Sequence, residues 1–233
     1  MKYYETQKLF YGKYLYKIGF YHGLNNIFRT EFQKNGTLGF ARERIDQLTD
    51  SYRRGVVMSI PVYRTWKEID QETYLDARHI YACLIRSKND YKIRVDAYGG
   101  MNVFSNDYKL IEKISKNLKT KRIEIWYPDK SIEKKLLKNS NIIISNNPVE
   151  WPIKITLGNR KRDYSGFANW ADHNKNKVRI GNVALRELHN HGYVSGYYFY
   201  IKSEKILNLI NIMVGDNIRR IDRIVYKDNI DKY

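Results

Sequence analysis

The residues of this chain best suited to chemistry are Lys and Arg side chains that come in short clusters. Clustered cations neutralise neighbouring phosphates, and phosphate contacts supply much of the affinity of proteins for nucleic acids. The alternative is a charged rim that merely keeps the surface solvated. The candidate phosphate-binding residues are Arg160, Lys161, Arg162, Lys175, Lys177, Arg179, Arg219, Arg220, Arg223, Lys119, Lys121 and Arg122.

Aromatic residues accompany these cations, and their chemistry would be stacking on bases. The run Tyr197–Tyr200 places two rings on each face of a predicted strand. An aromatic ring on an open sheet face contributes about 1–3 kcal/mol for each base that stacks on it. The alternative is that the rings fill an interface within the protein. The candidates are Tyr164, Tyr198 and Tyr200, with Tyr98, Phe104 and Trp126 as their analogues earlier in the chain.

Two histidines separated by one residue, His189 and His191, suggest metal binding. They resemble the paired metal ligands of rolling-circle replication nucleases, which also use a ferredoxin-like sheet and a catalytic Tyr. In that family the pair lies on a strand. Here it lies at a predicted helix end, where the helix dipole alone favours cationic His. We therefore expect no metal site, and a metal-dependent nuclease stays an alternative.

Signatures of other enzyme classes are missing from the sequence. It contains no Walker A motif, no dinucleotide-binding glycine motif, no HExxH and no GxSxG. The carboxylates are scattered, and no pair has the spacing of a metal-binding DxD. The one cysteine, Cys83, can form neither an internal disulfide nor a cysteine zinc site. We expect no cofactor, we favour a binding protein over an enzyme, and we assign no family.

The composition narrows the class of partner. The chain has 233 residues and a net charge of +17, which favours a polyanion, DNA or RNA, as the partner. No apolar run approaches the roughly 20 residues of a membrane span, and the N-terminus does not read as a secretory signal. We therefore expect no membrane partner and a cytoplasmic protein. Frequent Lys, Asn, Ile and Tyr suggest an AT-rich genome, such as that of a phage or its bacterial host.

The elements that must position these residues show an internal repeat. Residues 104–127 and 200–226 share an aromatic strand end, an amphipathic helix, a basic turn and a closing strand. The apolar helix positions match at a constant offset of about 96 residues, counted along the sequence. They are Leu110, Ile111, Ile114 and Leu118 in the first copy, and Ile206, Leu207, Ile210 and Val214 in the second.

The order of the predicted elements indicates the fold class. Strands over 56–63, 91–98, 101–104 and 122–127 and helices over 70–87 and 108–118 follow each other as β-α-β-β-α-β, the order of a ferredoxin-like module. Gly99-Gly100 predicts a two-residue hairpin turn. The order recurs from residue 153. We predict an α+β protein with an N-terminal β-α extension (1–55), a first ferredoxin-like module with a linker (56–147) and a second module (148–233).

Three functions are compatible with these observations. The first is a nucleic-acid-binding protein whose basic turns bind phosphates and whose strand aromatics stack on bases. The composition suggests that a phage encodes it. The second is a nuclease or nicking enzyme that uses His189, His191 and a Tyr. The third is a virion or host-interaction protein, in which the Tyr-rich faces bind a protein partner or a second copy of the chain.

Overall fold

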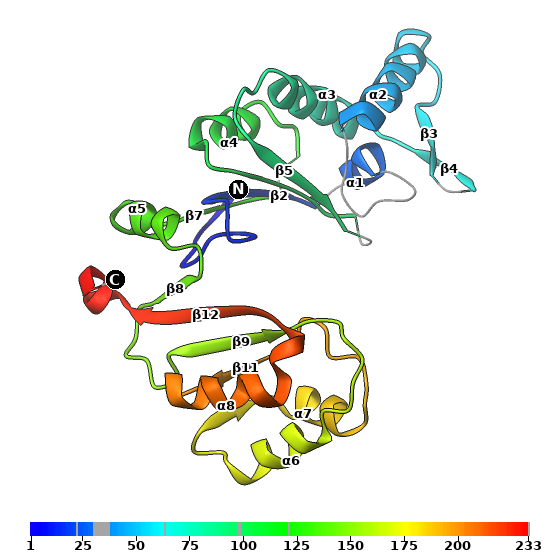
Figure 1. The fold of residues 1–233 in the computed structure, drawn as a ribbon. Helices are drawn as coiled ribbons and strands as arrows, with labels where there is room; N and C mark the ends of the chain where they lie inside the picture. Colours follow the sequence, from blue (N-terminus) through cyan, green and yellow to red (C-terminus); the bar gives the residue numbers. More distant parts are fainter. Residues whose placement is uncertain (22, 30–37, 63, 97–98, 121, 233) are drawn as a thin grey trace. The chain divides into compact units, whose positions relative to one another are not determined.

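Two five-stranded sheets, each in its own part of the chain, organise the protein (Figure 1). The computed structural model describes residues 1–21, 23–29, 38–62, 64–96, 99–120 and 122–232. The chain divides into a first unit, Met1–Lys138, and a second unit, Asn139–Tyr233. The predicted α+β class is confirmed, because each unit combines a mixed sheet with helices.

The sheet of the first unit has the strand order β1-β7-β2-β6-β5. Strand β1 runs parallel to β7, and the other neighbouring pairs are antiparallel. Alternation along the central strand buries Tyr16, Ile18 and Phe20 and directs Lys17 to the opposite face. The five strands are β1 (Lys2–Glu5), β2 (Tyr16–Phe20), β5 (Tyr91–Val95), β6 (Met101–Ser105) and β7 (Ile123–Tyr127).

Helices cover one face of this sheet. Helix α3 begins after Asp70, whose carboxylate accepts a hydrogen bond from the Thr73 amide at 2.7 Å. Asp107 caps α4 in the same way, at 2.9 Å from the Lys109 amide. A hairpin of β3 (Ser59–Val62) and β4 (Thr65–Glu68) forms a separate two-stranded sheet. The helices are α1 (Leu24–Phe28), α2 (Leu38–Arg53), α3 (Gln71–Ile85), α4 (Tyr108–Ser115) and α5 (Lys130–Lys138).

The sheet of the second unit has the strand order β10-β11-β9-β12-β8. Strand β8 runs parallel to β12, and the other neighbouring pairs are antiparallel. The strands are β8 (Ile142–Ser145), β9 (Ile153–Leu157), β10 (Val178–Ile180), β11 (Tyr198–Ile201) and β12 (Ile218–Tyr226).

The core of the second unit lies between one face of this sheet and the unit's three α-helices. Ile155 and Phe199 of the sheet pack with Phe167 of α6 and Ile210 of α8, and all four are almost fully buried. Among the described residues of the second unit, no helix covers the other face of the sheet (Figure 1). The helices are α6 (Ser165–His173), α7 (Asn182–His189), α8 (Glu204–Val214) and the short 3-10 helices η1 (Gly215–Asn217) and η2 (Lys227–Lys232).

The two sheets are connected in the same way. The strands correspond as β2 to β9, β5 to β10, β6 to β11 and β7 to β12, with β1 and β8 as the added edge strands. The repeat seen in the sequence falls on β6–α4–β7 and β11–α8–β12. Register places Lys17 between Phe104 and Trp126 in the first sheet, and Lys154 between Tyr200 and Asp222 in the second.

In the first unit, the segment predicted to be the first strand of the main sheet is not part of that sheet. The segment predicted as the first strand, 56–63, contributes β3, which pairs with β4 outside the five-stranded sheet. The position expected for it belongs to β2, from the predicted N-terminal extension over 1–55. Pro61 has no amide proton to give to a sheet, and Ile60 alone of β3 is buried. The chain divides between residues 138 and 139, and strand β8, which the prediction placed in the linker before residue 148, pairs with β12 of the second unit.

The turn predicted at Gly99-Gly100 is also longer than expected. Val95 pairs with Met101, so the connection includes Asp96 as well as the two glycines. The Asp96 amide donates to the Gly100 carbonyl at 2.9 Å, and the Gly100 amide donates back to the Asp96 carboxylate at 2.7 Å. Tyr98 lies outside the described residues.

Within the described part of the chain, no helix is both long enough and apolar enough to cross a membrane.

Candidate nucleic-acid interface

The face of the second sheet opposite the unit's helices carries polar and aromatic side chains. Along β9 the apolar residues point into the core, whereas Lys154 and Thr156 are partly exposed on the opposite face. Strand β11 alternates in the same way: Phe199 is buried, and Tyr198 and Tyr200 lie on the face of Lys154. We call this face the open face of the second unit.

Strand register arranges the open face in two rows. In one row, Arg179 of β10 lies opposite Tyr200, Tyr200 opposite Lys154, and Lys154 opposite Asp222. In the next row, Tyr198 lies opposite Thr156, and Thr156 opposite Arg220. Rings and cations therefore alternate across the middle of the sheet, and neighbouring strands in a sheet lie about 5 Å apart.

Direct contacts hold these side chains in place. The Lys154 ammonium lies 3.9 Å from the centroid of the Tyr198 ring, and the Tyr198 and Tyr200 rings meet edge to face at 5.6 Å. Arg220 donates to the Asp222 carboxylate at 2.5 Å and to the Ser140 carbonyl at 2.9 Å. Burial raises the pKa of the Tyr200 phenol, so the ring is neutral at physiological pH.

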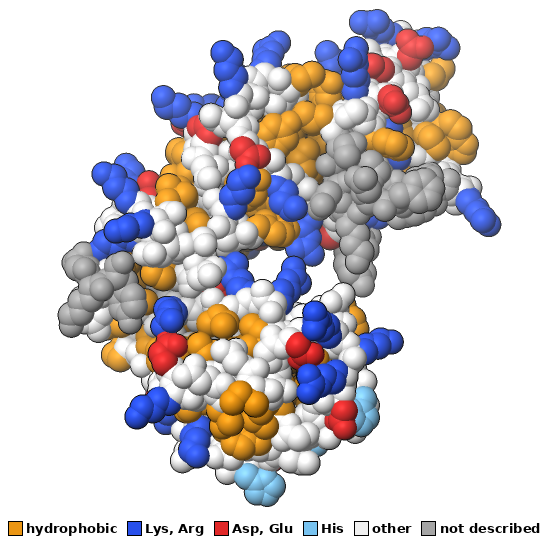
Figure 2. Space-filling view, viewed as in Figure 1, with side chains coloured by type: hydrophobic (Ala, Val, Ile, Leu, Met, Phe, Trp, Pro, Cys, Tyr) orange, Lys and Arg blue, Asp and Glu red, His pale blue; other side chains and the backbone are white. Residues whose placement is uncertain are grey.

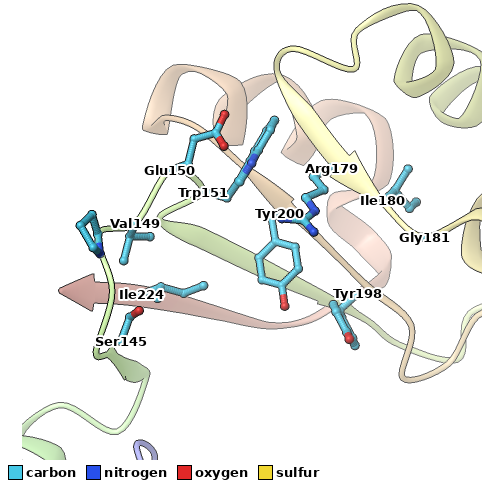
Figure 3. Close-up of a pocket in the computed structure, with 11 residues that line it drawn as sticks. Ser145, Val149, Glu150, Trp151, Arg179, Ile180, Gly181, Tyr198, Tyr200 and Ile224 are labelled. Carbon is cyan, nitrogen blue, oxygen red and sulfur yellow. The ribbon is translucent and has the colours of Figure 1, made fainter. Parts of the chain in front are cut away.

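A hollow of about 640 Å³ opens on this face (Figure 3). Tyr198, Tyr200 and Arg179 form one side of it, and Trp151, from the segment that connects β8 to β9, forms another. A smaller hollow of about 270 Å³ adjoins it, because Trp151, Arg179 and Ile180 line both. Lys175 lines the smaller hollow. The size of the larger one falls within the about 300–1,000 Å³ that is usual for ligand sites.

The acidic residues near these hollows already have partners. Glu150 lies 3.0 Å from the Lys202 ammonium, which also lies 4.7 Å from the centroid of the Trp151 ring. Asp172, on the wall of the smaller hollow, accepts a hydrogen bond from His189 Nε2 at 2.9 Å. Arg179 and Lys175 are exposed. The balance of charge at the hollows therefore suits an anionic ligand.

In the first unit the corresponding face is crowded. One row across the sheet runs Lys92, Phe104, Lys17, Trp126 and Tyr4, so cations and rings alternate here too. Trp126 stacks on Tyr4 at 5.1 Å, and the Lys17 ammonium lies 3.6 Å from the Trp126 ring centroid. Burial lowers the pKa of Lys17. Phe104 is 5% exposed.

The predicted cluster Arg160–Arg162 lies on the loop between β9 and α6. Arg160 and Arg162 both approach Asp216, at 3.6 and 3.2 Å. Tyr164, which was predicted to stack on bases, is 4% exposed and packs in the core of the second unit. Its ring points into the core, and its hydroxyl donates a hydrogen bond to the Arg160 carbonyl at 3.4 Å. Lys161 is exposed on the same loop.

The other predicted cations of the second unit do not share one surface. Arg179 and Arg220 lie on the open face. Arg223 points toward the helices and pairs with Glu204 at the start of α8. Arg219 lines a separate hollow of about 380 Å³ beside Arg160. Lys177 donates to the Asn174 side chain at 3.0 Å.

A buried carboxylate holds the basic turn of the first unit, residues 119–122, by hydrogen bonds to its backbone. Asp76 of α3, which is 2% exposed, accepts hydrogen bonds from the Lys119 amide at 2.6 Å and the Thr120 amide at 2.9 Å. The Lys119 and Arg122 side chains are exposed. Lys121 lies outside the described residues. This turn therefore has a defined backbone, whatever its side chains bind.

The two histidines considered as metal ligands face different carboxylates. His189, the last residue of α7, pairs with Asp172, and His191 Nδ1 lies 3.3 Å from Asp163. His191 adopts a left-handed backbone conformation, with φ of 55°, which continues the turn after the helix. No cluster of three or more His, Cys, Asp or Glu side chains suited to a metal ion occurs among the residues that the structure describes.

Two residues of the open face and its hollow were not predicted from the sequence. Lys154 sits at the centre of the open face, and Trp151 forms a wall of the larger hollow. The alternation of Ile153-Lys154-Ile155 could have placed Lys154 opposite the core. No sequence signal could have placed Trp151, because it lies in an irregular segment.

No family model, no curated protein and no solved structure matches this chain.

Lys and Arg side chains are spread over the face of both units that Figure 2 shows, with fewer acidic side chains between them. This distribution agrees with the net charge of +17 and does not single out one patch. Affinity for a polyanion would therefore have a broad electrostatic component. Charge alone therefore does not locate a binding site on this surface.

Proposed function

We propose that the protein binds single-stranded nucleic acid through the open face of the second unit. One observation carries the proposal: two tyrosine rings, Tyr198 and Tyr200, lie together on the sheet face opposite the helices of the second unit, with Lys154 and Arg179 beside them. Rings on a sheet stack on unpaired bases, and the cations contact the backbone phosphates. A duplex keeps its bases stacked inside, which is why a single strand fits this surface better.

We also propose that both units are ferredoxin-like modules. In each module the first strand lies between the last strand and the third, which is the ferredoxin-like strand order and supports this proposal. The matched repeats of strand, helix and strand support it as well. Each unit adds one parallel edge strand to that plan. A phage or bacterial source and a cytoplasmic setting complete the proposal, and their support is the composition of the sequence alone.

The experiment that tests this function compares three full-length proteins on a labelled single-stranded oligonucleotide. The double variant Tyr198→Ala with Tyr200→Ala removes both rings of the open face. The control Tyr193→Ala removes a ring of the same unit that is 68% exposed and lies outside the sheet. We expect the double variant to lose affinity by about tenfold or more, and the control to bind as the unchanged protein does. Equal affinities for all three would refute the proposed site.

A protein-binding role is the second candidate function, and a specific observation favours it. Trp66 of β4 and Val57, which precedes β3 by two residues, are each 68% exposed, and Val56 is 55% exposed. Exposed Trp side chains are frequent hot spots of protein interfaces. Light scattering after nuclease treatment tests this role: an oligomer that persists in the unchanged protein and dissociates in Trp66→Ala would support it.

A further inference from the structure

The ring that Phe104 presents in the first unit corresponds by register to that of Tyr200 in the second. Phe104 lies opposite Lys17 and Lys92, and Tyr200 lies opposite Lys154 and Arg179. Their surroundings differ. Phe104 is almost fully buried, whereas Tyr200 is partly exposed and lines the hollow of about 640 Å³.

Phe104 is buried because the chain itself supplies rings to cover it. The Phe10 ring lies 5.5 Å from Phe104 and tilted, and the Tyr11 ring meets Phe104 edge to face at 5.0 Å. The Lys92 ammonium lies 4.7 Å from the Tyr11 ring centroid, and Arg94 donates to the Tyr11 hydroxyl at 3.2 Å. This part of the first sheet therefore holds the planar ring of Tyr11 through three contacts. They are the contact with the Phe104 ring, the Lys92 ammonium near the ring face and the hydrogen bond from Arg94 to the hydroxyl.

The second unit lacks such a cover at the corresponding place. Residues 6–15, which connect β1 to β2, contribute Phe10 and Tyr11 in the first unit. The corresponding connection between β8 and β9, residues 146–152, is shorter and forms a wall of the hollow instead. Trp151 of this wall and Tyr200 of the sheet leave the space between them open.

We propose that this hollow binds one unstacked nucleobase, in the place that Tyr11 and Phe10 take in the first unit. The base would contact the Tyr200 and Trp151 rings, as the first unit's own rings contact Phe104. Arg179, the register equivalent of Lys92, would hold the base from the side or contact its phosphate. Lys175 in the adjoining hollow adds a second cation for that phosphate. This proposal rests on the proposed function and adds a discrete base pocket to it.

Charge distinguishes a nucleotide from the other occupant that fits, an aromatic side chain of a protein partner. Arg179 and Lys175 are exposed cations on the walls of the two hollows, and the acids Glu150 and Asp172 are already paired. A nucleotide supplies both a ring and a phosphate, whereas a Tyr or Phe side chain supplies the ring alone. The nucleotide therefore satisfies more of the groups that the site presents.

The direct test follows the tryptophan indole N–H resonances of the full chain by NMR. AMP is the probe, and ribose 5-phosphate and N-acetyltyrosine amide are the comparison ligands. The Trp151 resonance is assigned with the Trp151→Phe variant. We expect AMP to shift the Trp151 resonance and to leave that of Trp66 in place. Equal shifts with ribose 5-phosphate would show a phosphate site only, and equal shifts with N-acetyltyrosine amide would show a protein-ring site; either overturns the proposal.

Variants of Trp151 test the base pocket separately from the rest of the open face. We expect Trp151→Ala to weaken oligonucleotide binding by about fivefold or more, and Trp151→Phe, which keeps a ring, to retain it. Trp66→Ala is the matched control, and circular dichroism verifies that each variant folds. If Trp151→Ala and Trp66→Ala both bind as tightly as the unchanged protein, the base pocket is wrong and the proposed function stands. If AMP binds but no oligonucleotide does, the pocket stands and the proposed function fails.

Discussion

Lys17 and Lys154 hold the same position in the two sheets, and each ammonium group lies against an aromatic ring. The distance to the ring centroid is 3.6 Å for Lys17 and Trp126, and 3.9 Å for Lys154 and Tyr198. The rings come from different strands, β7 in the first unit and β11 in the second. Each unit thus keeps a cation at the centre of the face opposite its helices and supports it with a different ring.

The first prediction separates these two lysines. Replacing Lys154 by Met should weaken binding to a single-stranded oligonucleotide and reduce the slope of log affinity against log salt by about 0.7, the value for one phosphate contact. Replacing Lys17 by Met should leave the slope unchanged, because Trp126 and the neighbouring rings occupy its surroundings. Fluorescence anisotropy at several salt concentrations measures both. A larger loss of slope for Lys17→Met would contradict the assignment of the site to the second unit.

The second prediction concerns the chemistry of Tyr200. Stacking needs the ring and not the hydroxyl, so Tyr200→Phe should bind single strands as the unchanged protein does, and Tyr200→Ala should bind about fivefold or more weakly. The same anisotropy titration measures both variants. Equal losses for Phe and Ala would show that the hydroxyl carries the contact, and that stacking does not explain this residue.

The sequence was sufficient to predict most of the elements and the repeat, because both depend on periodicity. The amphipathic helix predicted within residues 200–226 and the first strand of the order predicted to recur from residue 153 are present as α8 and β9. Their apolar residues recur at the intervals of a helix and a strand. Periodicity does not predict which strands pair with each other. Strand β2 lies far along the chain from its partners β6 and β7, and no local pattern predicts that contact.

The candidate site was predicted in part for a related reason. Alternation placed Tyr198 and Tyr200 on one face, and the structure agrees. The direction of Tyr164 depends on how a loop folds back onto the core, and the sequence of a loop does not determine this. Arg220 and Arg223 were grouped by proximity, although a strand directs them to opposite faces. A register-based count of β12 would have separated them.

The third prediction is a pH dependence in the first unit. Burial, together with a 2.7 Å hydrogen bond from its hydroxyl to Glu133, raises the pKa of Tyr16 well above the usual value. The folded state therefore keeps the phenol proton longer than the unfolded state does. The stability from this group is complete below about pH 10, the ordinary tyrosine pKa, and is lost as pH rises through the raised value.

Tyr16→Phe tests this dependence by urea unfolding at several pH values. At neutral pH the variant should have a free energy of unfolding lower by about 1 kcal/mol, since it lacks the hydrogen bond to Glu133. The difference should shrink as pH rises above about 10, where the unchanged protein loses this contribution. A difference that stays constant across that range would show that the Tyr16 hydroxyl adds no pH-dependent stability.

The fourth prediction concerns the anchor of the basic turn. Asp76→Ala leaves the Lys119 and Thr120 amides without their acceptor, and Thr120 is itself 8% exposed. We expect the free energy of unfolding to fall by about 2–4 kcal/mol, the range for lost hydrogen bonds to a charged group and buried donors left unpaired. The matched control Asp46→Ala removes an exposed carboxylate 3.8 Å from Arg42 and should change stability by less than about 0.5 kcal/mol. Similar losses in the two variants would contradict the anchoring role.

The most direct test of nucleic-acid binding is the salt dependence of the affinity of the unchanged protein for a single-stranded oligonucleotide. Phosphate contacts by Lys154, Arg179 and Lys175 predict a slope of about −2 for log affinity against log salt. The affinity should therefore fall by about tenfold to twentyfold between about 50 mM and about 200 mM salt. An affinity that does not change over this range, or no binding at the lower salt concentration, would contradict the proposed function.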